Sequence, residues 1–264
     1  MIRRFPLLSY FVLAYAFTWA IEIPVALGAR GSIDFHLPMW IEALAAFGPF
    51  AAAIIVLRVT DGPDGVSRLL ASLVRWRVPP LWLAMTVVPP FLVMIAALAM
   101  TGETGKLFSG QLCRDLMDAG KMLELIFISS LIRGVGEEPG WRGYALPMLR
   151  EKHGPLVATL LLWPVWAVWH LPAFLARPEF AAGAAIGFTF GILAATAWTT
   201  LLYDKTRSVL MLVLWHTLVN ITRGIAGSAS GEAFMAYAQV TTLLGIAVIA
   251  YWLITRANDR YVRA

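Results

Sequence analysis

Three short clusters in the second half of the chain contain side chains that could together hydrolyse a bond. The first cluster supplies two neighbouring carboxylates and an arginine, the second an imidazole, and the third an imidazole and an amide. A carboxylate or an imidazole can take a proton from water, and an amide or an imidazole can hydrogen-bond to the oxyanion of a tetrahedral intermediate. The residues are Glu137, Glu138 and Arg142, then His170, then His216 and Asn220.

Helical spacing predicts different partners for the two carboxylates. Glu138 lies four residues before Arg142, so the two side chains can form an ion pair on one helix face. Glu137 is rotated by about 100° from Glu138, which leaves it free for a different task. Pro139 suits the first turn of a helix, so we expect a helix break near Glu137 that leaves backbone N–H groups close to the carboxylates.

The other two clusters also space their residues four apart. Trp166 precedes His170 and places an aromatic wall beside its imidazole, while His216 and Asn220 project a ring and an amide into the same space. Each cluster alone has a plain structural interpretation, either as a solvated helix end or as hydrogen bonds between helices. Three such clusters on three separate helices favour a functional site.

The composition places this site in a membrane. The chain has 264 residues, of which 59% are hydrophobic and 14% are charged, and its mean hydropathy is +0.73. Soluble domains carry about 25% charged residues and cannot bury such an apolar surplus. A cytosolic enzyme is therefore excluded, and the net charge of +5 reports membrane topology rather than nucleic-acid binding. Cys113 is the single cysteine, so an intrachain disulfide is excluded.

Apolar windows of about 20 residues predict an all-α polytopic membrane protein of about eight transmembrane helices, with the active site inside the bundle. We expect residues 1–264 to form a single transmembrane domain whose motif-bearing core covers about 116–224. The carboxylate cluster falls at the inner end of the fourth span. The predicted spans are Phe5–Ala29, Leu37–Val59, Pro79–Met100, Leu116–Val135, Pro155–Leu175, Ala181–Tyr203, Ser208–Arg223 and Phe234–Thr255.

Basic residues are distributed unevenly between the two sides of this bundle. With a cytoplasmic N-terminus and alternating spans, fifteen of the 21 lysines and arginines fall on the cytoplasmic side, as the positive-inside rule predicts. Both termini are therefore expected in the cytoplasm. The first apolar segment is longer than the core of a signal peptide, so we expect it to remain as a span. The fifteen are Arg3, Arg4, Arg58, Arg68, Arg75, Arg77, Arg133, Arg142, Arg150, Lys152, Lys205, Arg207, Arg256, Arg260 and Arg263.

Several other polar residues carry expectations of their own. Glu22, Glu42 and Glu124 lie near the ends of predicted spans, where they would snorkel or pair rather than relay protons. Arg133 is expected to pair with the first carboxylate of the cluster or to face the cytoplasm. Residues Arg68–Val78 mix leucines with arginines and predict a short amphipathic helix on the inner membrane surface.

The three clusters, in this order, resemble the motifs of the CPBP family, the intramembrane endopeptidases of the CAAX prenyl protease 2 type, also known as Abi or bacteriocin-processing proteins. The motifs are Glu137-Glu138-x-x-x-Arg142, an aromatic residue before His170, and His216-x-x-x-Asn220, and they cover about residues 137–220. The chain departs from the family pattern at Trp166, where Phe is usual, and at Trp141, where Phe often precedes the arginine. Neither departure removes a chemical group.

The resemblance implies hydrolysis of a peptide bond at membrane depth, near the cytoplasmic face. The substrate would be a membrane-associated peptide or lipidated protein, of the prenylated CAAX type or bacteriocin- or pheromone-like, and the short loops favour a bacterial inner membrane. Carried over, the roles are general base for Glu137, positioning of the water for His170, oxyanion stabilisation for His216 and Asn220, and support of the geometry for Glu138 and Arg142.

Other interpretations of the same residues stay open. Glu137, His170 and His216 could bind a catalytic zinc ion, but the chain has no H-E-x-x-H sequence, and we expect a reaction without metal or other cofactor. An inactive scaffold or bacteriocin-immunity protein would keep the fold with degraded motifs, whereas every motif residue is present here. A proton-coupled transporter would spread ionisable residues through both halves of the bundle. The expected partners are a peptide substrate and the lipid bilayer, without nucleic acid.

Overall fold

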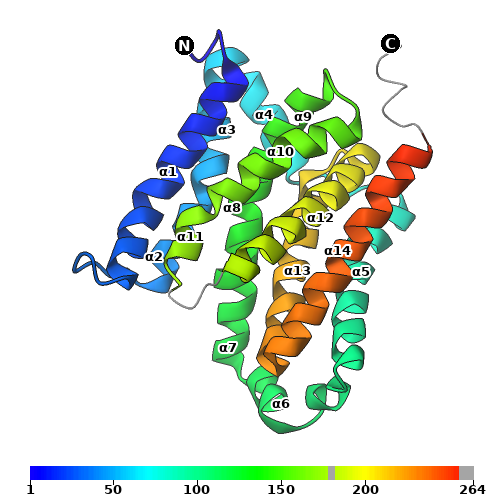
Figure 1. The fold of residues 1–264 in the computed structure, drawn as a ribbon. Coiled ribbons are helices and arrows are strands. Elements are labelled where there is room, and N and C mark those ends of the chain that lie inside the picture. Colours follow the sequence, from blue (N-terminus) through cyan, green and yellow to red (C-terminus); the bar gives the residue numbers. More distant parts are fainter. Residues whose placement is uncertain (178–181, 256–264) are drawn as a thin grey trace.

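The computed structural model describes residues 1–177 and 182–255, and all secondary structure in these ranges is helical (Figure 1). The predicted all-α class is confirmed. The helices are α1 (Pro6–Ala29), α2 (Met39–Ala43), α3 (Gly48–Thr60), α4 (Gly62–Ser72), α5 (Pro80–Met100), α6 (Gly110–Met117), α7 (Ala119–Leu123), α8 (Ile132–Gly140), α9 (Leu146–Arg150), α10 (Pro155–Trp169), α11 (Leu171–Leu175), α12 (Ala182–Thr206), α13 (Val209–Ala229) and α14 (Gly231–Ile254). Short 3-10 segments lie at Leu44–Phe47 and Thr104–Leu107, and π-helical segments at Glu124–Leu131 and Trp141–Ala145.

Within the described residues, six helices are long and apolar enough to cross a membrane. They match six of the predicted spans, and the predicted fifth span is the shorter apolar helix α10 followed by α11. The start of the predicted sixth span at Ala181 lies outside the described residues, as do Arg256, Arg260 and Arg263. The six helices are Pro6–Ala29, Trp40–Thr60, Pro80–Met100, Ile186–Thr206, Val209–Ala229 and Gly231–Ile254.

The predicted fourth span differs from expectation because its helix does not break at the carboxylates. Helical segments follow one another without a gap from Ala119 to Arg150. Pro139 lies inside α8, and a π-helical turn follows directly after Gly140. A proline inside a helix removes one hydrogen bond and crowds the preceding turn, and a wider turn is a common accommodation. The two glutamates therefore lie in the middle of a long helical run and not at the inner end of a span.

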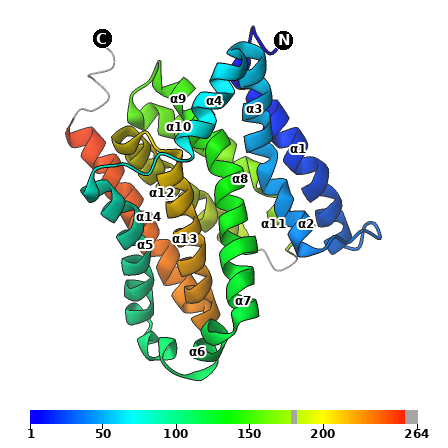
Figure 2. The same ribbon diagram turned by 180° about the vertical axis from the view of Figure 1, so that it is seen from behind.

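Helix α8 lies at the centre of the bundle, between two groups of helices (Figures 1 and 2). It packs against α3 on one side and α13 on the other, while α1 covers α3 and α5 packs on α13. Helix α12 packs between α10 and α14. The start of α1 and the end of α14 lie at one end of the bundle, and α6 lies at the opposite end (Figure 1). This arrangement brings the three motif-bearing helices, α8, α10 and α13, around one central volume.

Two glycines allow α8 to approach its neighbour closely. A Cβ atom on Gly136 would lie 2.6 Å from the backbone O of Ala46, and one on Gly140 would lie 2.4 Å from the backbone O of Pro49. Both distances are shorter than real Cβ contacts, so no larger residue fits at either position without moving backbone. Small residues four apart are a common device for close helix packing in membranes. The glycine face of α8 thus points at α3, and the carboxylates occupy the remaining faces.

The predicted amphipathic helix at Arg68–Val78 forms only in part. Helix α4 begins earlier, at Gly62, and ends at Ser72, and residues 75–79 are not helical. The apolar side of α4 is anchored by Leu69, which is buried, whereas Val74 and Trp76 are exposed beyond the helix end. Pro79 and Pro80 follow and start α5. Prolines at a helix start restrict the preceding residues to extended backbone, so the amphipathic helix cannot run on into α5.

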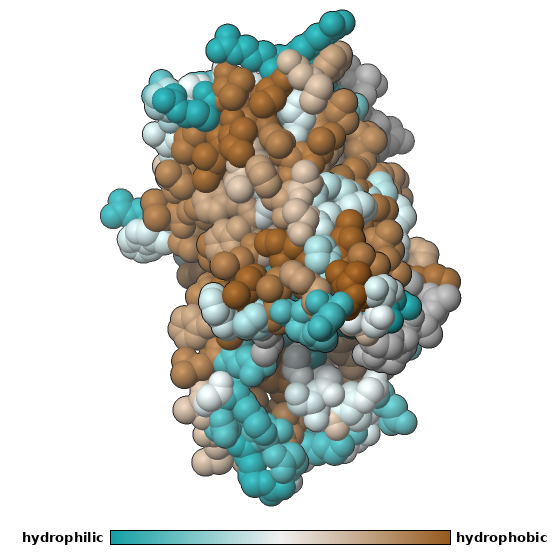
Figure 3. All heavy atoms as spheres, turned by 90° about the vertical axis from the view of Figure 1, so that its left-hand side faces the viewer, coloured by the Kyte–Doolittle hydropathy of each residue, from teal (hydrophilic) through white to brown (hydrophobic). Residues whose placement is uncertain are grey.

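The surface is apolar where a bilayer would contact it. Large side chains such as Leu81, Leu92, Ile246 and Leu253 are exposed on the long helices. One face of the molecule shows a broad band of hydrophobic side chains, with hydrophilic ones along one edge and at the far end (Figure 3). An exposed apolar surface of this extent is stable only in lipid. The chain is accordingly a membrane protein with several spanning helices.

Candidate active site

The three sequence clusters meet inside the bundle. Glu137 and Glu138 come from α8, His170 from the C-terminal end of α10, and His216 and Asn220 from α13. Glu137, Glu138 and Arg142 have 1%, 0% and 0% of their surface exposed, so the charged part of the site is closed to solvent. The six predicted residues are thus brought to one place by helices that are distant in sequence.

Glu137 lies between an indole and an imidazole. The Nε1 atom of Trp166 donates a hydrogen bond of 2.9 Å to Glu137 Oε2. The same oxygen lies 3.9 Å from Nε2 of His170. That separation is too long for a direct hydrogen bond but suits a bridging water. Glu137 is therefore oriented toward His170, at a separation that one bridging water would span.

The ring of His170 is held in one orientation by its own helix. Its Nδ1 lies 2.8 Å from the backbone O of Trp166, and because a carbonyl only accepts, Nδ1 carries the hydrogen. The rings of Trp169, Phe174 and Phe188 pack against the imidazole at centroid distances of 4.8, 6.2 and 5.2 Å. Nε2 is left as the free nitrogen, and it faces Glu137.

Glu138 has a separate set of partners. Arg142 donates a hydrogen bond of 3.1 Å to Glu138 Oε1, which is the ion pair predicted from their spacing. His216 Nδ1 lies 2.7 Å from the same oxygen. The Arg142 guanidinium also stacks over the Trp166 ring, with its Cζ 3.8 Å from the centroid. Glu138, Arg142 and His216 thus form one buried hydrogen-bonded unit beside Glu137.

This unit changes what His216 can do. Its Nδ1 is engaged by Glu138, so only Nε2 remains to meet a substrate. A ring with a hydrogen on Nδ1 donates from Nε2 only when it carries a second proton.

Asn220 is oriented by a residue that the sequence reasoning did not select. Arg223 Nη2 donates a hydrogen bond of 3.0 Å to Asn220 Oδ1. This bond assigns the amide oxygen, and the NH2 group of Asn220 is left as a donor. Arg223 lies one turn beyond Asn220 in the predicted seventh span, and its charge inside an apolar helix was the available signal.

A second unpredicted partner is Thr199 on α12. Arg142 Nε donates a hydrogen bond of 3.1 Å to the Thr199 hydroxyl, which in turn donates to the backbone O of Ala195 at 2.7 Å. Thr199 is fully buried. Threonines within an apolar helix are common and usually bond to their own backbone, so nothing in the sequence distinguished this one.

The remaining carboxylates have different surroundings. Glu124 is exposed, which agrees with a residue at the end of a span. Glu22 is 7% exposed, and its Oε2 has no hydrogen-bond partner within the described chain, so the expectation that it snorkels is wrong. Arg133 forms no ion pair with Glu137 among the described residues, although it lies close enough to act on it electrostatically. Arg133 itself is half-buried.

A catalytic zinc ion would need three protein ligands at about 2.0–2.3 Å around one point. His216 Nδ1 is engaged by Glu138, which leaves Nε2 as the other ring nitrogen. Among the described residues, no group of three or more His, Cys, Asp or Glu side chains is arranged to hold a metal ion.

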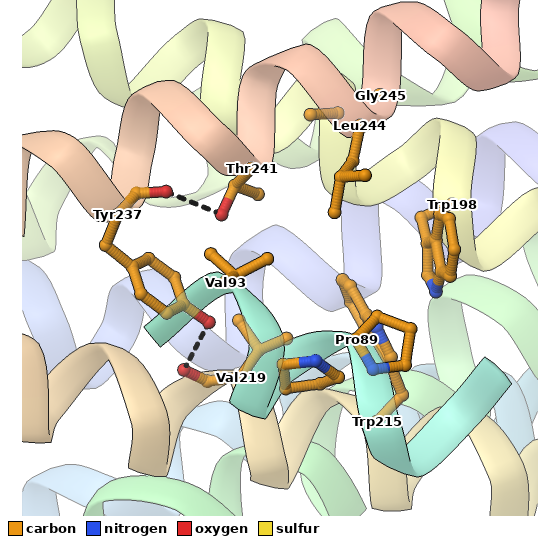
Figure 4. A pocket seen from close by; sticks show the side chains of 11 residues that line it. Pro89, Val93, Trp198, Trp215, Val219, Tyr237, Thr241, Leu244 and Gly245 are labelled. Atoms are coloured by element: carbon orange, nitrogen blue, oxygen red, sulfur yellow. Dashed lines mark hydrogen bonds between the residues drawn. The ribbon is translucent and has the colours of Figure 1, made fainter. Parts of the chain in front are cut away.

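A small apolar cavity lies behind the site (Figure 4). It encloses about 20 Å³ between α5, α12, α13 and α14, which is room for about one water molecule. Trp215 and Val219 in its wall are the sequence neighbours of His216 and Asn220, and the Tyr237 hydroxyl donates to the backbone O of Val219. The cavity is too small for a peptide side chain of any length, so it is not the substrate site.

Comparisons with known proteins agree with the geometry. Residues 119–222, which include all six site residues, match the family of type II CAAX prenyl endopeptidases described as Rce1-like. The chain is also 21% identical over 256 residues to CAAX prenyl protease 2 of Methanococcus maripaludis, and the alignment covers 92% of each chain. The family match and this likeness support the resemblance of the chain to the CPBP-family intramembrane proteases.

Proposed function

We propose that this protein cleaves a peptide bond of a membrane-associated, lipidated peptide with Glu137 as the general base. The observation that carries the proposal is the buried Glu137 carboxylate, which Trp166 holds at one oxygen while His170 Nε2 faces the same oxygen at 3.9 Å. The similar protein of Methanococcus maripaludis is, as its name says, a CAAX prenyl protease. We extend this substrate class, a prenylated peptide, to the present chain.

The attacking water would lie between Glu137 and His170. With the hydrogen on Nδ1, His170 offers a lone pair at Nε2, so the water donates one hydrogen to His170 and the other to Glu137 Oε2. Its own lone pair then points toward the substrate carbonyl. As the oxygen–carbon bond forms, Glu137 takes the proton and passes it to the leaving amine when the carbon–nitrogen bond breaks.

Asn220 and His216 would bind the oxyanion. Asn220 presents its NH2 group because Arg223 holds the amide oxygen. His216 keeps Nδ1 on Glu138 and would present Nε2 to the oxyanion, where it donates when the ring carries a hydrogen on each nitrogen. Removal of one such donor costs about 10²–10³ in rate in enzymes of this type of chemistry. Glu138 and Arg142 act through His216 and Trp166 and would not touch the substrate.

The proposed reaction needs no metal ion, and one experiment separates it from the zinc mechanism. Purified protein in liposomes is given a fluorogenic prenylated peptide, with wild type, Glu137→Gln and His170→Ala compared with and without a chelator. We expect both variants to lose at least about a hundredfold in kcat/KM, and the chelator to change nothing. Loss of wild-type activity with chelator would overturn the metal-free mechanism.

Two controls complete the test. Glu124→Gln removes an exposed carboxylate of the same chain and should keep wild-type activity. Equal activity in Glu137→Gln and wild type would remove the catalytic assignment, and no cleavage by wild type would favour a scaffold that keeps the fold.

We further propose that residues 1–264 act as one domain in a bacterial inner membrane, with both termini in the cytoplasm.

A further inference from the structure

Two segments that are far apart in sequence lie side by side where three of the long apolar helices begin or end (Figure 2). One segment leads into α5, and the other joins the end of α12 to the start of α13. The Ser208 hydroxyl donates a hydrogen bond of 2.6 Å to the backbone O of Arg75. Lys205 Nζ lies 5.7 Å from the centre of the Trp82 ring. Because spanning helices begin and end at the edge of the hydrocarbon core, both segments lie at the depth of the lipid headgroups.

Four basic side chains on these segments are exposed and form no ion pair within the described residues. We call them the basic surface: Arg75, Arg77, Lys205 and Arg207. The neighbouring carboxylate in the sequence, Asp204, does not neutralise them, because Arg150 donates to both of its oxygens at 3.0 and 2.8 Å. A group of unpaired cations at headgroup depth attracts anionic lipid.

Aromatic rings lie against three of these cations. Arg77 Cζ is 5.2 Å from the centre of the Trp76 ring, and Arg207 Cζ is 5.2 Å from the centre of the Tyr203 ring. The third is the contact of the lysine with the first turn of α5. Trp76 is 65% exposed, so most of its surface is open to the surroundings. Tryptophan beside arginine and lysine is typical of protein surfaces at the membrane–water interface.

The backbone of Arg207 adopts a conformation that favours glycine. Its φ is 51°, and within the described part of the chain it is the one residue other than glycine with a positive φ. Glycine enters this left-handed region without steric cost, whereas a residue with a side chain is strained there. Strained residues cluster at functional sites, where the surrounding structure holds them in place. The turn between α12 and α13 thus keeps a cation at a position where folding alone would favour glycine.

We propose that the basic surface binds the headgroup phosphate of an anionic phospholipid. The planar fork of an arginine matches phosphate oxygens, and the charges are complementary. Exposed apolar side chains adjoin the surface at Trp76 and at Leu81 on the first turn of α5, and they suit acyl chains better than an acidic protein. The bound lipid would link the start of α5 to the turn between α12 and α13. The four cations lie outside the candidate active site, so this inference does not depend on peptide cleavage.

Native mass spectrometry of the full-length protein in neutral detergent tests the proposal. Phosphatidylglycerol and phosphatidylcholine with identical acyl chains are added in equal amounts, and the ratio of the two bound lipids is measured. We expect wild type to prefer phosphatidylglycerol. Each basic residue near an anionic lipid surface strengthens binding about fivefold, so Arg207→Gly should lower the ratio about fivefold. This variant relieves the strained backbone and should keep its thermal unfolding midpoint in detergent without lipid.

A second variant and a matched control complete the test. Arg75→Gln removes a cation but keeps the backbone O that Ser208 binds, and it should lower the ratio by a similar factor. Arg68→Gln changes the net charge equally but removes an exposed arginine of α4 that is paired with Asp61 at 2.7 Å, so it should keep the wild-type ratio.

Three outcomes would overturn the inference. The first is equal binding of the two lipids by wild type. The second is a fall of the ratio in Arg68→Gln as large as in Arg75→Gln, which would show that net charge alone attracts the lipid. The third is displacement of phosphatidylglycerol by an equal concentration of glycerol phosphate, which would show that the surface binds a soluble phosphate compound.

Discussion

At the scale of residues, two adjacent carboxylates have different environments because one helical step turns them to different neighbours. Glu137 meets Trp166 and His170, while Glu138 meets Arg142 and His216. The first therefore has an oxygen that can take a proton, and the second is held by Arg142 and the His216 ring. This division predicts that stability responds differently when Glu137 loses its charge and when Glu138 loses its cationic partner Arg142.

Removal of the buried ion pair should lower stability. Arg142→Met leaves Glu138 buried without its cation, and breaking a buried pair in this way costs about 3–5 kcal/mol. We expect a clearly lower thermal unfolding midpoint, followed by tryptophan fluorescence in detergent. Glu137→Gln removes a charge that has no ion pair within 3.5 Å and keeps the bond from Trp166, so it should unfold at or above the wild-type temperature. Equal destabilisation of the two variants would contradict the assignment.

The indole of Trp166 should contribute modestly to the rate. Trp166→Phe keeps an aromatic ring over Arg142 but removes the donor to Glu137 Oε2. One neutral hydrogen bond is worth about 1 kcal/mol, so we expect kcat to fall by less than about tenfold, with the fold retained. Trp163→Phe is the matched control. Trp163 lies on the same helix as Trp166, α10, and its indole donates to the backbone O of Thr189 on α12, away from Glu137. A rate change in the control that equals that of Trp166→Phe would rule out a local effect.

At the scale of elements, different faces of α8 make different contacts, one with backbone and the others with the site residues. Gly136 and Gly140 face the backbone of Ala46 and Pro49, and the neighbouring positions present the carboxylates to α10 and α13. The π-helical turn after Gly140 keeps the helix continuous, which holds Arg142 in register with Glu138. The close approach of α8 to α3 therefore sets the position of the reactive group.

A methyl group at this contact should displace α8. In Gly140→Ala the new Cβ would lie 2.4 Å from the backbone O of Pro49, so backbone must shift. Overpacking of this kind costs about 1–3 kcal/mol, and we expect both a lower unfolding midpoint and a loss of peptide cleavage. Gly191→Ala on α12 meets no atom within 4 Å and should be neutral or slightly stabilising. A fully active Gly140→Ala would show that α8 tolerates displacement.

At the scale of the whole molecule, the bundle has two ends of different composition. The start of α1, α4 and the end of α14 lie together at one end, and α6 lies at the other (Figure 1). From the positive-inside rule we propose that the first end faces the cytoplasm. The orientation matters for function because it decides from which side a peptide reaches Glu137.

Cysteine labelling tests this orientation. In a Cys113→Ser background, Ser67→Cys on α4 and Ser109→Cys next to α6 are a matched pair of exposed positions at opposite ends. A membrane-impermeant maleimide added to intact spheroplasts should label the cysteine at 109 and spare the one at 67, and lysis should expose both. The reverse pattern would place the N-terminus outside.

The sequence alone determined those features that depend on composition and on neighbours along one helix. Six apolar helices match predicted spans because hydrophobic length is a local property. The pair of Glu138 and Arg142 followed from residues four apart on one helix. The motifs also pointed to the family that residues 119–222 match, since the order of acid, imidazole and amide can be recognised without any knowledge of distances.

Only the tertiary structure decided which of these groups meet. His216 reaches Glu138 across 78 residues of sequence, and Arg142 reaches Thr199 across 57. Such contacts depend on how α8, α12 and α13 pack, and helical periodicity specifies a face but not the partner on the next helix. The sequence likewise did not predict that the helix continues through Pro139. A π-helical turn after Gly140 accommodates the proline, which alone would break the helix. Packing between distant segments, rather than spacing along the chain, assigns each carboxylate its task.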